Sequence, residues 1–154
     1  MSNLRQMNYR EFAKLRFLDF FPKTAAYWED HEGGVETGIG VVCVEGYQDT
    51  IFTSPCDGRW QTAEMILELG GDCPEAEGHA LLDRLGLGLR KSMTAAQIEA
   101  VLGRPGKDTT DCNRLMRFIL GDKHPYYISC LIVEDRLWRV YIGRKDLVDK
   151  EDAL

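Results

Sequence analysis

The feature that most constrains the fold is a run of alternating side chains in the last third of the chain. Three segments, Asn113–Leu120, Tyr126–Val133 and Arg136–Ile142, place apolar residues at every second position. A period of two is typical of β-strands. Only Gly121–Pro125 and Glu134–Asp135 separate them, and connections this short join antiparallel neighbours. The run therefore predicts a three-stranded antiparallel meander.

A short capped helix is predicted immediately before this meander. Thr94 is a natural N-cap, and Gln97 three residues later completes a capping box. Met93 and Ile98 are spaced to form a hydrophobic staple, and Gly103 ends the helix. Because the helix has little more than two turns, packing must supply most of its stability.

The helix follows the pattern M-T-x-x-Q-[IV]-x-x-[VL]-L-G-x-P. Its matching residues are Met93, Thr94, Gln97, Ile98, Val101, Leu102, Gly103 and Pro105. With the meander after it, the region from Leu87 to Gly143 resembles the SmpA/OmlA domain, whose architecture is related to that of the β-lactamase inhibitor protein. The resemblance implies a non-enzymatic scaffold that binds another protein. It assigns no site, because the pattern describes a capped helix.

The first half of the chain predicts further helices and strands. Asn8 and Glu11 form a second capping-box pattern, so we expect a helix over Asn8–Phe21. Thr62–Leu69 alternates like a strand but is rich in good helix formers, and we favour a helix. Four further expectations are strands over Ile39–Tyr47 and Thr50–Thr53, a polar loop over Trp28–Gly38 and a helix over Pro74–Leu85.

These elements together predict an α+β fold, with helices packed on one side of a mostly antiparallel sheet. The length of 154 residues suits one domain. Within 1–154 we expect an N-terminal α/β half (1–85), an SmpA/OmlA-like half (86–145) and a frayed, charged tail (146–154).

The composition excludes several classes of partner. A net charge of −6 disfavours nucleic-acid binding, which requires a concentrated basic face. No apolar run approaches the roughly 18 residues of a membrane span. The polar start of the chain lacks the apolar region of a signal peptide. We therefore expect a cytoplasmic protein that binds neither nucleic acid nor membrane.

The five cysteines predict neither a disulfide framework nor a metal site. Their number is odd, and none forms a Cys-x-x-Cys pair. Cys43 and Cys130 lie in apolar runs and are expected to be buried, whereas Cys56 and Cys73 lie in expected loops. We expect no cofactor and no metal.

We predict a protein-binding module, either an inhibitor or a toxin-neutralising immunity protein. Arg117, Tyr127, Arg139 and Tyr141 are the candidate partner-binding residues, because arginine and tyrosine are common interface hot spots. The net negative charge would steer the chain toward a basic partner.

Two alternatives are considered beside this hypothesis. One is a small enzyme or small-molecule-binding protein, for which Cys56 and His79 are the best local features, although no catalytic constellation is visible. The other is a self-assembling structural protein, in which Phe20 and Phe21 or an open sheet edge would form a homodimer.

Overall fold

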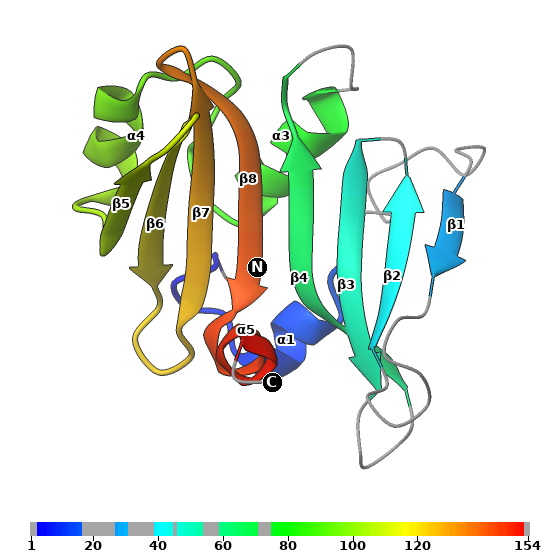
Figure 1. Cartoon of the computed structure of the whole chain (residues 1–154). Coiled ribbons are helices and arrows are strands. Elements are labelled where there is room, and N and C mark those ends of the chain that lie inside the picture. Colours follow the sequence, from blue (N-terminus) through cyan, green and yellow to red (C-terminus); the bar gives the residue numbers. More distant parts are fainter. Residues whose placement is uncertain are drawn as a thin grey trace.

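The computed structural model describes residues 3–16, 27–30, 39–44, 46–53, 59–70 and 75–152. They form an α+β fold built on one eight-stranded antiparallel sheet (Figure 1). The strands are β1 (Tyr27–Asp30), β2 (Ile39–Val44), β3 (Tyr47–Thr53), β4 (Trp60–Glu68), β5 (Lys107–Thr110), β6 (Arg114–Leu120), β7 (Tyr126–Val133) and β8 (Arg136–Arg144). The helices are α1 (Tyr9–Ala13), α3 (Glu75–Arg84), α4 (Ala95–Leu102) and α5 (Lys145–Asp152).

The order of the strands is β1-β2-β3-β4-β8-β7-β6-β5. Each half of the chain therefore contributes four consecutive strands, and the last strand of each half lies at the centre of the sheet. Pairing between β4 and β8 runs from Glu64 opposite Gly143 to Glu68 opposite Arg139. The sheet is thus continuous between the two halves of the chain.

The local signals around α4 are confirmed. Thr94 Oγ1 accepts a hydrogen bond from the N–H of Gln97, and Gln97 Oε1 accepts one from the N–H of Thr94. Glu134 and Asp135 have φ of 51° and 56°, as a two-residue hairpin turn requires. The Asp135 carboxylate also accepts a hydrogen bond from the N–H of Ala95. The β7–β8 hairpin is thereby tied to the first turn of α4.

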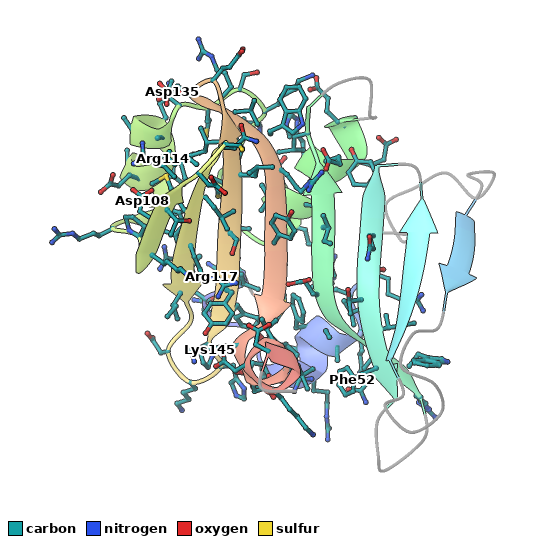
Figure 2. All side chains as sticks on the ribbon, in the orientation of Figure 1. Phe52, Asp108, Arg114, Arg117, Asp135 and Lys145 are labelled. Atoms are coloured by element: carbon teal, nitrogen blue, oxygen red, sulfur yellow. The ribbon has the colours of Figure 1, made fainter. Side chains whose placement is uncertain are left out.

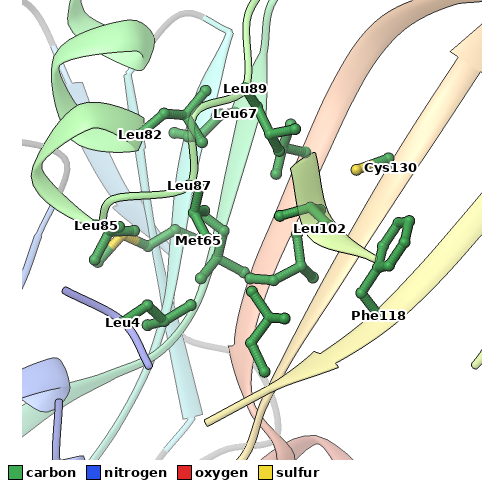
Figure 3. Close-up of a cluster of buried hydrophobic side chains, with 14 of the residues drawn as sticks. Leu4, Met65, Leu67, Leu82, Leu85, Leu87, Leu89, Leu102, Phe118 and Cys130 are labelled. Atoms are coloured by element: carbon green, nitrogen blue, oxygen red, sulfur yellow. The ribbon is translucent and has the colours of Figure 1, made fainter. Parts of the chain in front are cut away.

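One hydrophobic core lies between a single face of the sheet and the helices α1, α3 and α4 (Figure 3). Its large aromatic side chains on the strands are Tyr47 of β3, Phe118 of β6 and Tyr126 of β7, and Phe12 comes from α1. The Tyr126 hydroxyl donates to the carbonyl of Met7 at 2.8 Å, so this buried polar group is satisfied. The leucines come from several elements: Leu4, Leu15, Leu67, Leu69, Leu81, Leu82, Leu85, Leu87, Leu89, Leu102, Leu120 and Leu137.

The expectation of a helix over Thr62–Leu69 is wrong, because these residues belong to β4 and the link that follows it. Ala63, Met65 and Leu67 are buried, and the residues between them are half-exposed. This alternation matches a strand with one face on the core. Burial of every second side chain therefore outweighs the helix propensity of the segment.

Other boundaries also differ from expectation. α1 ends at Ala13, whereas the helix was expected to continue to Phe21. Residues 17–21 of the expected helix lie outside the described part of the chain. Tyr27–Asp30 is a strand that overlaps the expected loop. The expected frayed tail is helical through Asp152, because α5 packs on the sheet and is supported by an ion pair between Lys145 and Asp149.

Candidate functional site

The sheet face opposite the core, hereafter the open face, contains all four candidate partner-binding residues. The strand register places Arg117, Ser129 and Tyr141 in one row across β6, β7 and β8. α5 packs over one end of this face, where the Val148 side chain contacts Gly143. The helices α1, α3 and α4 lie against the other face, so the helices do not all share one side. The open face also includes Glu64, Ile66, Glu68, Leu115, Ile119, Tyr127, Leu131 and Arg139.

Arg117 is held flat on the face by two neighbours. Its guanidinium lies 4.4 Å from the centroid of the Tyr127 ring, and its Nε donates to Ser129 Oγ at 3.2 Å. Stacking of this kind is favourable for arginine. Within the described part of the chain, Arg117 forms no ion pair. Its remaining N–H groups are therefore available to an acceptor that approaches the face.

Arg139 is held by a different set of contacts. It forms an ion pair with Glu68 of β4 and donates to the Tyr141 hydroxyl at 2.9 Å. Its guanidinium lies 5.8 Å from the centroid of the Tyr141 ring. The four predicted residues thus form two arginine–tyrosine pairs, one across β6 and β7 and one within β8, and both arginines have fixed positions before any partner binds.

A shallow hollow lies between these pairs. Glu64, Leu115, Arg117, Tyr127, Ser129 and Tyr141 line it. Its volume is about 110 Å³, whereas pockets for drug-sized ligands have roughly 300–1,000 Å³. The hollow therefore suits one side chain of a docked protein better than an enclosed small molecule.

α5 borders the hollow through a small polar network. The Tyr127 hydroxyl donates to one carboxylate oxygen of Asp149 at 2.6 Å, and Lys145 Nζ contacts the other at 2.5 Å. Lys145 and Arg117 both lie over the Tyr127 ring, and they lie at the end of the face that α5 covers (Figure 2). These contacts fix the orientation of the Tyr127 ring.

Hydrogen bonds from Lys145 and then Tyr127 hold the pKa of Asp149 below its ordinary value of 3.8. A lowered pKa in the folded state means that the carboxylate form stabilises the fold. This stabilisation is present above the unfolded-state pKa and is lost as the pH falls through the lower folded-state pKa. We expect a carboxyl NMR titration of Asp149 to show a midpoint below 3.8.

Lys145→Gln should move that midpoint upward, because the substitution removes the largest cause of the shift. Lys150→Gln is the matched control, since Lys150 is an exposed lysine of the same helix. An Asp149 midpoint that is unaffected by Lys145→Gln would contradict the network.

The features considered for catalysis are not assembled into a site in the described residues. His79 Nε2 accepts a hydrogen bond from the N–H of Lys91 at 3.1 Å, so this nitrogen supports the link between α3 and α4. Cys56 and Cys73 lie outside the described residues. Cys130 is buried as predicted, and burial raises the pKa of its thiol to about 12.

Two kinds of feature are absent from the described ranges of the chain. No group of three or more His, Cys, Asp or Glu residues there is placed to hold a metal ion. Of the helices described, none has the length and apolar character needed to cross a membrane.

Sequence reasoning missed Ser129 and Glu68, the residues that position the two arginines. Ser129 is a polar residue within the apolar run of β7, and it is buried. A buried serine needs a hydrogen-bond partner, which was a usable signal. Glu68 was missed because Thr62–Leu69 was expected to form a helix and not a strand of this face.

Comparisons with protein-family models, curated proteins and solved structures found no match to this chain.

Proposed function

We propose that this chain is a non-enzymatic protein-binding module whose partner docks on the open face. The observation that carries the proposal is Arg117, which is stacked on Tyr127 beside a shallow hollow. It forms no ion pair among the described residues, although its charge helps to lower the pKa of Asp149. Arginine and tyrosine in partly desolvated positions are typical hot spots. A carboxylate or a backbone carbonyl of the partner would complete the hydrogen bonds of this guanidinium.

Preorganisation of the face supports the proposal. Ordering a long side chain costs roughly 0.5–1.5 kcal/mol on binding, and Ser129, Glu68 and the two tyrosine rings already order Arg117 and Arg139. Because α1, α3 and α4 pack on the far face, the centre of the open face is left for a partner.

The partner class follows from charge and from the family resemblance. The net charge of −6 favours approach to a basic protein. The resemblance to the SmpA/OmlA domain and the β-lactamase inhibitor protein suggests an inhibitor or an immunity protein that acts in the cytoplasm. The small hollow supports protein binding over the alternative of an enzyme or small-molecule carrier.

Affinity capture from a native lysate with open-face variants tests this proposal. Tyr127→Ala and Arg139→Ala should each weaken retention of a stoichiometric partner at least roughly tenfold, as expected for hot spots. Arg104→Ala and Glu99→Gln are the controls, since both residues are exposed and lie on or just after α4, which packs on the opposite face of the sheet. We expect both controls to retain most of the partner. Equal capture by all variants would contradict docking on this face.

A further inference from the structure

β5 is an open edge of the sheet. It is the last strand in the sheet order (Figure 1). All four of its residues are exposed. On its inner side it pairs with β6, and a bidentate ion pair between Asp108 and Arg114 helps to hold the two strands together (Figure 2). An exposed edge presents unpaired backbone groups that another strand can use.

The backbone bonds at the two ends of β5 show which of its groups are already used. The N–H of Gly106 donates to the carbonyl of Arg117 at 2.9 Å, and the N–H of Asp111 donates to the carbonyl of Asn113 at 3.0 Å. Thr109 is paired with Leu115, which lies midway between the two acceptor residues on β6. The backbone groups of the odd-numbered positions 107, 109 and 111 are therefore directed toward β6.

Within β5 the groups of the even-numbered positions must then point away from the sheet, because backbone groups alternate in direction along a strand. Gly106 precedes the strand, and its N–H is the exception. The outward groups of β5 are the N–H and C=O groups of Asp108 and Thr110. A second strand that pairs with β5 must bring its own free groups opposite these two residues.

We propose that this second strand is β5 of another copy of the chain, antiparallel and centred on Thr109. In this register Asp108 of each copy lies opposite Thr110 of the other copy. Every outward N–H and C=O group of these two residues then has a hydrogen-bond partner on the second strand. Thr109 lies opposite Thr109 in a pair without hydrogen bonds, where side chains are closest, and threonine pairs are favourable there.

Charge selects this register over its neighbours. With the axis at Thr109, Lys107 lies opposite Asp111 of the second copy, and this ion pair forms twice. An axis at Asp108 would place two like charges directly opposite, which is destabilising. An axis at Thr110 would leave Lys107 opposite the neutral Asn113.

The pairing would extend the proposed binding surface. A two-fold axis perpendicular to the sheet keeps both open faces on the same side, so the dimer would present two copies of the face to a partner. Multivalent presentation raises avidity without new contacts. The dimer itself does not depend on the partner, because β5 lies at the edge.

Disulfide trapping with the full chain tests the register. In Thr109→Cys the two new cysteines would be about 4.5 Å apart between Cα atoms, within the roughly 4.4–6.8 Å that a disulfide spans. The native Cys112 is exposed and serves as an internal control. In the proposed register the two Cys112 residues are separated by about six strand positions, or roughly 20 Å.

We expect mild oxidation to link position 109 to position 109 at least tenfold faster than Cys112 to Cys112, with the linked peptides identified by mass spectrometry. A second change, Asp111→Lys, should slow this linkage because it places Lys107 opposite a lysine. Adding Lys107→Asp should restore the rate. Arg139→Ala should leave it unchanged, which separates this dimer from docking on the open face. Equal rates at 109 and 112, or no rescue by the charge exchange, would overturn the proposal.

Discussion

Replacing Phe118 by alanine should destabilise the fold by roughly 3–5 kcal/mol, the usual cost of deleting a buried aromatic side chain. Phe118 is 1% exposed and lies in the core between the sheet and the helices. A domain of this kind has a total stability of about 5–15 kcal/mol, so the variant would lose a large part of it. Urea denaturation followed by circular dichroism measures the change, and the midpoint should fall sharply.

The adjacent residue provides the matched control. Ile119 is 52% exposed and faces the other side of the same strand. Ile119→Ala should cost less than about 1 kcal/mol, the full range of strand propensity. Equal losses for the two variants would contradict the assignment of core face and open face.

Replacing Gly121 by alanine is the second change with a large expected effect. Gly121 has a φ of +94°, and an added Cβ would lie 2.4 Å from the carbonyl oxygen of His124. Strain at such a backbone position costs about 1–3 kcal/mol, and overpacking adds about 1–3 kcal/mol. The link between β6 and β7 has to move to accommodate the methyl group.

Gly103→Ala separates these two contributions. Gly103 has a φ of +90°, but no atom lies within 4 Å of an added Cβ. We therefore expect only the strain component of about 1–3 kcal/mol there. Thermal or urea unfolding of both variants measures the difference. A smaller loss for Gly121→Ala than for Gly103→Ala would contradict the described geometry of the β6–β7 link.

The parts of the fold that could be predicted from sequence are those that local chemistry determines. Thr94 and Gln97 can form a capping box wherever the helix is placed. The alternating residues of β6, of β7 and of β8 from Arg139 to Ile142 have one apolar face, as the sequence pattern predicts. At the start of β8 the expected alternation fails, because a register shift in the pairing with β7 buries Leu137 and leaves Trp138 37% exposed. The four candidate residues share the open face because all of them have odd residue numbers, and the pairing of β6, β7 and β8 places these odd-numbered residues on one face.

The parts that could not be predicted depend on contacts between distant segments. Glu64 and Glu68 lie in a segment that is rich in good helix formers. The segment is a strand because it pairs with β3 on one side and β8 on the other. β5 has no apolar alternation, since Lys107–Thr110 is exposed throughout and is a strand because of β6. α5 is charged, and its helix is supported by packing of Val148 on Gly143.

Site-specific photo-crosslinking in the native cell can show whether a partner protein contacts the open face. A benzophenone amino acid at Ile119 places the probe on the open face, and the same probe at Ala100, exposed on α4, places it on the other side of the molecule. We expect a partner adduct from position 119 and none from position 100. An adduct from position 100 alone, or from neither position, would contradict docking on the open face.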